Sequence, residues 1–239
     1  MCYRCFWPQP LCWCESLPRI TTQTRFVFLM HPKEFKREKA GTGRLTHLSL
    51  PHSEIQVGVG FDDHPGVQRI IHDPALFPVL LYPGDPALDA TAGDLAPSRL
   101  GDRILTCFIV DATWACARKM VKLSPSLQRL PRLRFTASAP SRWLIKQQPD
   151  PGCLSTLEAV HEVLLNLTAA GREAYGPPFP LLDVFARLQQ IQLDCAADPD
   201  RPGYRRRPYT PPAERLAPSG QSRARRNFTG RGAAAPPAP

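Results

Sequence analysis

The stretch from Ile104 to Trp114, ILTCFIVDATW, decides the predicted fold of this 239-residue chain. Its first seven residues are almost continuously apolar, and the polar Asp111 follows them directly. A short apolar run of this kind is typical of a strand that is covered on both faces of a sheet. The residues from Asp111 onward therefore mark the carboxyl end of a buried strand, which is where open α/β sheets bind their ligands.

Other parts of the chain continue the same pattern. Three more strand-like runs are predicted at Arg25–Met30, Ile55–Phe61 and Leu76–Tyr82. Helical periodicity predicts helices at Thr113–Leu123, Ser155–Ala170 and Pro180–Leu193. Ser155 and Glu158 have the spacing of a capping box at the start of the second helix. Strands that alternate with helices predict an α/β domain whose mainly parallel sheet has helices on both faces.

The net charge of +9 is distributed unevenly: residues 1–200 carry +1, and residues 201–239 carry +8. From Ala196 onward, Pro, Arg, Gly and Ala dominate, and helical or strand periodicity is lost. This composition predicts a disordered tail over residues 196–239. The tail is either an Arg-rich aid to RNA binding or a solubilising extension.

Composition also excludes several classes of protein. The apolar runs, such as Leu76–Tyr82, are far too short to span a bilayer, and no apolar signal segment opens the chain. We therefore expect a soluble cytoplasmic protein without a membrane partner, and no feature indicates a stable protein partner. In that compartment the eight cysteines are thiols or metal ligands rather than a disulfide framework.

Four of the cysteines, Cys2, Cys5, Cys12 and Cys14, lie within the first 14 residues. Four thiolates so close in sequence can converge on one tetrahedral zinc, which would be structural because no position is left for water. The alternative is four unrelated reduced thiols. The zinc interpretation divides the chain into a metal-binding knob (1–19), a catalytic domain (20–195) and the tail (196–239).

Polar motifs follow the predicted strands and open the long helix: Leu81-Tyr82-Pro83-Gly84, Asp111-Ala112-Thr113-Trp114 and Leu154-Ser155-Thr156-Leu157-Glu158. Each alone also fits an ordinary turn or a helix cap. Together with three further motifs, they match the order and spacing of the motifs of a known protein family. These three are the cysteine cluster, Met30-His31-Pro32-Lys33-Glu34 and Thr42-Gly43-Arg44. Over residues 2–195 the chain resembles the DTW-domain proteins.

The resemblance implies a tRNA-uridine aminocarboxypropyltransferase with a SPOUT-like fold and a trefoil knot at the cofactor site. Such an enzyme moves the 3-amino-3-carboxypropyl group of S-adenosylmethionine to N3 of a tRNA uridine and releases methylthioadenosine. Resemblance to bacterial members implies a uridine in the variable loop. The catalytic candidates are then Asp111, Thr113 and Trp114. The cofactor-binding candidates are Tyr82, Pro83, Gly84, Asp111, Ser155, Thr156 and Glu158.

The chemistry of the reaction suits these residues. Uridine N3 must lose a proton before it attacks the carbon next to the sulfonium, and a carboxylate within hydrogen-bond reach can accept or orient that proton. Asp111 is the candidate, although it can equally bind the ammonium group of the cofactor or stabilise the sulfonium. Ser155 and Thr156 open a helix, whose N-terminal N–H groups suit the cofactor carboxylate.

A basic segment over residues 31–44 and the helix after Trp114 are the candidate tRNA-binding surface. Its members are His31, Lys33, Lys36, Arg37, Lys39, Arg44, Arg118, Lys119 and Lys122. The alternative for residues 31–44 is a solvated charged face, because Glu34 and Glu38 dilute the positive charge.

Two alternative functions remain open at this stage. One is a SPOUT-type RNA methyltransferase or an rRNA aminocarboxypropyltransferase. The mass of the product separates an added methyl group from an added aminocarboxypropyl group. The other is a non-catalytic RNA-binding zinc protein, which would bind tRNA but not S-adenosylmethionine.

Overall fold

A computed structural model describes residues 1–37, 41–95, 97–145, 153–198 and 200 of the chain. The strands in chain order are β1 (Arg25–Met30), β2 (Ser53–Val57), β3 (Leu76–Leu81), β4 (Ala87–Asp89), β5 (Ile104–Asp111) and β6 (Arg132–Arg134). The α-helices are α1 (Pro32–Arg37), α2 (Thr42–Ser49), α3 (Pro65–Ile71), α4 (Pro97–Leu100), α5 (Trp114–Lys122), α6 (Pro125–Gln128), α7 (Thr156–Ala169) and α8 (Pro180–Ala197). A 3-10 turn, η1, spans Gln9–Leu11.

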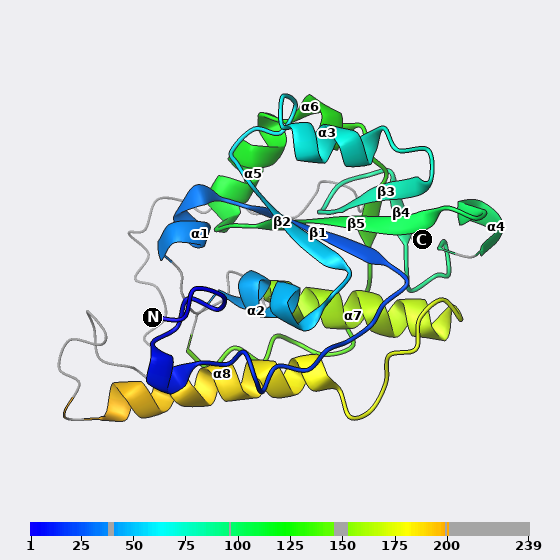
Figure 1. Cartoon of the computed structure of the whole chain (residues 1–239). Coiled ribbons are helices and arrows are strands. Elements are labelled where there is room, and N and C mark those ends of the chain that lie inside the picture. The colour runs from blue at the N-terminus through cyan, green and yellow to red at the C-terminus, as the bar shows by residue number, and fades with distance from the viewer. Residues whose placement is uncertain (38–40, 96, 146–152, 199, 201–239) are drawn as a thin grey trace, which may run out of the picture.

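The strands form one six-stranded sheet in the order β2-β1-β5-β3-β6-β4, and every neighbouring pair is parallel (Figure 1). The stretch quoted at the outset is β5, which lies inside the sheet between β1 and β3. The predicted α/β class and parallel sheet are therefore confirmed. Because all strands run the same way, their carboxyl ends meet at one edge.

The sheet is covered on both faces, as its apolar strands predict. Phe26 and Phe28 of β1 face a cluster with α7 and α8, whereas Val27 and Leu29 face a second cluster with α3 and α5. Figure 1 shows α2 and α7 against one face, with α8 beyond them, and α3, α5 and α6 against the other. Burial of alternate β1 residues on opposite faces explains why the run has no polar interruption.

The predicted long helices form close to the expected bounds. Thr113 precedes α5, and Ser155 caps α7 in a complete capping box with Glu158. The predicted end of the last helix at Leu193 is wrong, because α8 continues to Ala197 and takes in the first two residues assigned to the tail. Residues 201–239 lie outside the described part of the chain. Within the described part, none of the helices combines the length and apolar character needed to cross a bilayer.

The second predicted strand, Ile55–Phe61, is wrong in its bounds. β2 begins at Ser53 and ends at Val57, and the Gly58 N–H donates to Met30 O just beyond it. Phe61 instead leaves the sheet, buries its ring in the cluster with α3, and donates its N–H to Ser124 Oγ at 3.1 Å. Phe61 is therefore apolar because it packs against the helices on one face of the sheet, not because it belongs to a strand.

The short strands β4 and β6 escape prediction because each has only three residues, and β6 reads Arg-Leu-Arg. They pair with each other, and the terminal residues Asp89 and Arg134 face one another in register. Arg134 Nε lies 3.0 Å from Asp89 Oδ2. A charged cross-strand pair at the sheet edge replaces the apolar pattern on which strand prediction depends.

The N-terminal cysteine segment packs against the rest of the fold. Cys5, Trp7 and Trp13 are buried in the same cluster as the α7 face of the sheet. The rings of Trp7 and Trp13 meet edge to face at 5.2 Å, and the Arg187 guanidinium of α8 lies 4.8 Å from the Trp13 ring. The segment predicted as a knob therefore shares its hydrophobic core with the α/β domain.

Candidate active site

The carboxyl ends of β1 and β5 form the point at which the chain changes direction across the sheet. From β1 the chain leads to β2 on one side, and from β5 it leads to β6 on the other. The two ends remain in register, with Met30 opposite Asp111, and the His31 N–H donates to Asp111 O at 3.1 Å. Diverging connections of this kind leave a crevice in which α/β proteins bind ligands.

The Asp111 carboxylate lies at this point between the first turns of two helices. Thr156, the first residue of α7, donates its hydroxyl hydrogen to Asp111 Oδ1 at 2.7 Å. On the other side the carboxylate presses against Gly43 of α2, where a Cβ would come within 2.5 Å of Asp111 Cγ. The positive ends of two helix dipoles therefore face a negative charge held by β5.

Tyr82, Pro83 and Gly84 follow β3, the strand next to β5. Tyr82 is half-buried, and burial raises the pKa of its hydroxyl, while the nearby Arg118 and Arg132 oppose that shift. The Arg132 guanidinium lies 5.5 Å from the Tyr82 ring centre. Gly84 has φ +143°, which side chains strongly disfavour, so the backbone turn itself requires glycine here.

Ser155 and Glu158 are both buried and engaged with protein groups. The Ser155 hydroxyl accepts from Glu158 N, and the Glu158 carboxylate accepts from Ser155 N at 2.9 Å. The same carboxylate accepts from Ser141 Oγ at 3.0 Å and from Arg142 N at 2.6 Å. Glu158 thus anchors the segment after β6 to the start of α7. Of the three cofactor candidates on this helix, Thr156 is the one in contact with Asp111.

Thr113 and Trp114 lie at the start of α5 and face outward. Thr113 is exposed and makes no side-chain capping bond to the described residues. Trp114 is 37% exposed, a large fraction for a tryptophan, so it does not belong to the core. The structure therefore places a hydroxyl and an aromatic surface directly after Asp111.

The predicted basic residues fall into two groups. His31 is buried, its Nδ1 accepts from Lys33 N at 3.1 Å, and its pKa is lowered first by burial and then by Lys33 and Lys119. The exposed members are Lys33, Lys36, Arg118, Lys119 and Lys122. Lys39 lies outside the described residues, and the Arg37 side chain is not described. Lys33 and Lys119, which come from different connections, therefore both act on His31.

Arg44 is placed differently from the expected surface residue, because it is only 4% exposed. Its guanidinium lies between the rings of Phe6 and Phe35, at 4.2 and 4.7 Å from their centres. Its Nη2 donates to Phe35 O at 2.8 Å. Burial lowers its pKa, and the charges of Asp111 and Cys5 oppose that shift. Arg44 joins the cysteine segment, α1 and α2.

The four N-terminal cysteines converge, as their spacing predicts. The sulfur atoms all lie within 4.8 Å of one another, with Cys2–Cys14 at 3.6 Å and Cys5–Cys12 at 3.9 Å. Tetrahedral zinc with Zn–S bonds of about 2.3 Å places its sulfur ligands about 3.8 Å apart. The cluster therefore has the spacing and the donor set of a structural zinc site.

The protonation chemistry of the cluster also suits a cation. The backbone N–H groups of Cys5 and Arg4 lower the pKa of Cys2 to about 6. Burial and the neighbouring sulfur groups raise the pKa of Cys14 to about 12. One thiolate is thus stabilised by N–H donors, while four thiolates together require a positive charge among them.

The comparison with family models agrees with this geometry, since the DTW domain matches residues 1–193. The chain belongs to the DTW-domain family. This region takes in the cysteine cluster and every strand and reaches almost to the end of α8, so the family accounts for the whole sheet. No solved structure gives a significant match to the chain.

Curated relatives carry names of one activity. The chain is 31% identical over 173 residues to "tRNA-uridine aminocarboxypropyltransferase 2" of Drosophila melanogaster, covering 70% of this chain and 66% of the relative. It is 32% identical over 166 residues to the protein of that name in Mus musculus, covering 66% and 53%. It is 26% identical over 216 residues to "tRNA-uridine aminocarboxypropyltransferase A" of Arabidopsis thaliana, covering 81% and 82%. The DTW-domain chain thus spans between about half and two thirds of the fly and mouse relatives.

Two residues at this edge had no individual role in the sequence interpretation. Gly43 is the residue against which Asp111 packs, and only its place in Thr42-Gly43-Arg44 signalled it. Arg132 lies beside Tyr82, and its buried Nη1 has no hydrogen-bond partner among the described residues. Arg132 belongs to a short strand without a recognisable pattern, so the sequence carried no signal for it.

Proposed function

We propose that this DTW-domain chain transfers the 3-amino-3-carboxypropyl group of S-adenosylmethionine to N3 of a tRNA uridine. The names of the curated relatives support the reaction and the tRNA substrate. The observation that carries the proposal for this chain is the position of Asp111, which lies at the carboxyl edge of the sheet between Gly43 and Thr156.

Asp111 is the group we assign to the N3 proton of the uridine. A carboxylate accepts or orients that proton when it lies within hydrogen-bond distance of the imide. The Thr156 hydroxyl holds Oδ1, and Gly43 blocks movement toward α2, so the carboxylate has a restricted orientation. A carboxylate oxygen can accept more than one hydrogen bond, so the bond from Thr156 is compatible with the proposed role of Asp111.

The donor site is assigned to the loop Tyr82-Pro83-Gly84 together with Arg132. S-adenosylmethionine, when bound, supplies an electrophilic carbon next to its sulfonium and leaves as methylthioadenosine. The buried Arg132 Nη1 beside Tyr82 has no hydrogen-bond partner within the described residues, and it suits the carboxylate of the transferred group. Thr156 orients Asp111, while Ser155 and Glu158 keep the first turn of α7 in place.

The uridine site is assigned to the exposed start of α5. Trp114 offers an aromatic surface on which a base can stack, and Thr113 offers a hydroxyl. The exposed Lys33, Arg118 and Lys119 place positive charge at the same edge, where the RNA backbone would approach.

We extend the proposal to the SPOUT-like trefoil knot and to the structural zinc. The knot rests on the family to which the chain belongs; in the structure, Ser138 and Arg142 of the segment after β6 hydrogen-bond to Glu162 and Glu158 of α7, and Arg142 also accepts from Gln189 of α8. The sulfur spacing supports the zinc, which would hold the N-terminal segment against the core.

Nucleoside mass spectrometry of unmodified tRNA incubated with the protein and S-adenosylmethionine tests the reaction. We expect a uridine enlarged by an aminocarboxypropyl group; an added methyl group, or tRNA left unmodified while rRNA in a parallel reaction gains the group, would overturn the proposal. The Asp111→Asn variant should give no product, whereas Asp63→Asn, a change at an exposed aspartate after β2, should leave the yield unchanged. Normal turnover by Asp111→Asn would refute the role of this carboxylate.

A further inference from the structure

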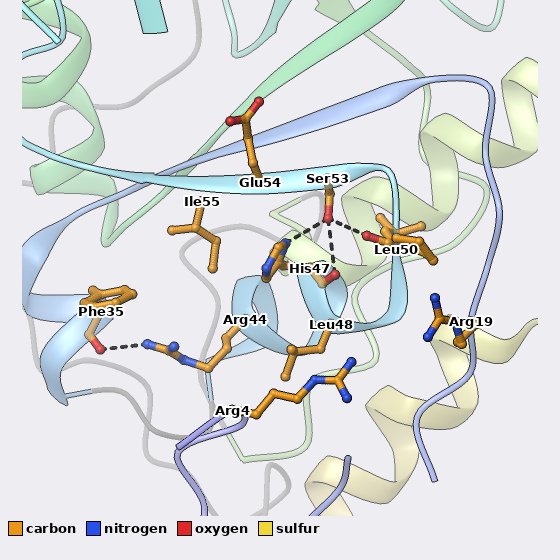
Figure 2. Close-up of a pocket in the computed structure, with 11 residues that line it drawn as sticks. Arg4, Arg19, Phe35, Arg44, His47, Leu48, Leu50, Ser53, Glu54 and Ile55 are labelled. Carbon is orange, nitrogen blue, oxygen red and sulfur yellow. Dashed lines mark hydrogen bonds between the residues drawn. The ribbon is translucent and has the colours of Figure 1, made fainter. Parts of the chain in front are cut away.

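A second site lies beside the first turn of α2, in a groove of about 570 Å³ between β2, α2 and the cysteine segment. Figure 2 shows the side chains that line it, and Asp111 is not one of them. Three arginines from separate parts of the chain, Arg4, Arg19 and Arg44, contribute to its lining. The groove therefore gathers positive charge that the sequence distributes over forty residues.

These charges are not neutralised within the groove. Arg4 and Arg19 are exposed, and neither forms an ion pair or a side-chain hydrogen bond with the described residues. Arg44 is buried, and its Nε has no hydrogen-bond partner in the described part of the chain. The nearby Asp111 offsets part of the Arg44 charge, whereas Arg4 and Arg19 have no ion-pair partner among the described residues and raise the positive potential of the space next to them.

Glu54 is the one acidic residue among the described residues that line the groove, and its carboxylate already has partners outside the three arginines. Its carboxylate pairs with Arg25 and accepts from Gln56 Nε2 at 2.8 Å. Figure 2 shows its side chain projecting from β2 away from Arg4 and Arg19, while His47 lies on the arginine side. The groove thus keeps the charge of its arginines.

Several residues that line the groove affect the hydrogen bonding and the pKa of His47. Its Nδ1 lies 2.8 Å from Ser53 Oγ, and its pKa is lowered first by burial and then by Arg44, with a smaller effect from Arg4 and an opposing one from Glu54. An uncharged imidazole at this position remains a hydrogen-bonding group between the arginines.

The groove is connected to the candidate active site through α2. Arg44 directly follows Gly43, which contacts the Asp111 carboxylate. Arg4 lies between two cysteines of the cluster, and its backbone N–H bonds to the Cys2 sulfur. The cysteine cluster therefore positions Arg4 at the groove. The first turn of α2 contacts Asp111 through Gly43 and contributes Arg44 to the groove.

We propose that this groove binds the phosphate backbone of the substrate RNA, as a docking site separate from the uridine site. Guanidinium groups match phosphate oxygens in pairs, and several of them in a concave surface suit a polyanion. The inference rests on the proposed function, which supplies the RNA as the ligand. The modified base of that RNA would reach Asp111, while a neighbouring part of its backbone lies against Arg4 and Arg19.

Fluorescence anisotropy with full-length protein and labelled unmodified tRNA, over a range of salt concentrations, tests the proposal. The test variant is Arg4→Gln/Arg19→Gln. The matched control is Arg69→Gln/Arg129→Gln, which removes two exposed arginines beside α3 and α6 on the other side of the sheet. Both variants lose the same net charge, so a general electrostatic effect would weaken binding equally. Circular dichroism of each variant verifies that it is folded.

The groove variant should raise the Kd for tRNA about 10-fold at about 100 mM salt and reduce the slope of log Kd against log salt by about 2, since each lost phosphate contact removes about 1. Equal Kd and slope in the two variants would overturn the proposal. A groove variant that loses binding of inorganic phosphate or a mononucleotide but keeps its tRNA affinity would also overturn it, in favour of a small-anion site.

The same variants separate this inference from the proposed function. Weaker tRNA binding by the groove variant, without any aminocarboxypropyl product from the wild-type protein, would support the groove and refute the reaction. Product formed by the wild-type protein, with normal tRNA binding by the groove variant, would refute the groove alone.

Discussion

Replacement of Gly43 by alanine tests the tight packing of Asp111 against α2. Gly43 is the second residue of α2, and alanine in a helix is usually more favourable than glycine by about 1 kcal/mol. An open helix surface would therefore predict a more stable protein. The structure predicts the reverse, because the new Cβ would lie 2.5 Å from Asp111 Cγ and the carboxylate would have to move.

The magnitude follows from the contact that this movement breaks. Thr156 donates to Asp111 Oδ1 at 2.7 Å, and a hydrogen bond to a charged group contributes about 1.5–3 kcal/mol. Subtracting the gain in helix propensity leaves a net loss of about 0.5–2 kcal/mol in the free energy of unfolding. Because a displacement of about 1 Å in a catalytic group can lower the rate about 100-fold, turnover should fall more than stability.

Gly66 provides the matched control, because it is the second residue of α3. There a new Cβ would meet the flexible end of the Gln56 side chain at 2.8 Å, which can move at little cost. Urea unfolding followed by circular dichroism, together with product formation by mass spectrometry, measures both variants. We expect Gly66→Ala to be neutral or stabilising and active. A Gly43→Ala variant that is as stable and as active as Gly66→Ala would refute the reasoning.

Three further changes have definite expected outcomes. Trp114→Ala should lower kcat/KM by about 5- to 150-fold, which corresponds to about 1–3 kcal/mol of lost stacking on the base; kinetics equal to those of the wild-type protein would remove Trp114 from the uridine site. Cys14→Ser should abolish zinc binding, whereas Cys116→Ser, a change outside the cluster, should retain it; elemental analysis of the purified variants measures the zinc content. Zinc retained by both variants would show that the cysteine cluster is not the zinc site. Burial lowers the pKa of His161, so the unfolded chain binds this proton more readily than the folded protein. The free energy of unfolding should therefore fall as the pH drops below about 6.5, by up to about 1.4 kcal/mol per pH unit. The His161→Asn variant should show a smaller pH slope between pH 5 and 7; an unchanged slope would contradict this assignment.

The predictions that succeeded depend on interactions between residues close in sequence. The capping box of Ser155 and Glu158 starts α7 where the sequence indicates, because both hydrogen bonds form within one turn. The convergence of Cys2, Cys5, Cys12 and Cys14 is similarly local, since all four lie within 14 residues.

The predictions that failed concern residues whose conformation depends on distant partners. Phe61 looks like the end of a strand, but Ser124 from the α5–α6 junction takes its N–H. Arg44 looks like an exposed member of a basic surface, but Phe6 and Phe35 enclose its guanidinium and leave it 4% exposed; its part in RNA binding stays a prediction. In each case the side chain has the expected chemistry, and a contact with another part of the chain decides its use.

The amino-acid sequence alone determined the α/β class, the parallel sheet, the cysteine cluster and the identity of the strand-end motifs, because apolar periodicity and short spacings are local properties. The tertiary structure decided which motifs meet. It placed Asp111 of β5 between Gly43 and Thr156, and it gathered Arg4, Arg19 and Arg44 around one groove. The physical reason is that strand order and helix packing set distances between segments far apart in the chain, and no local pattern encodes those distances.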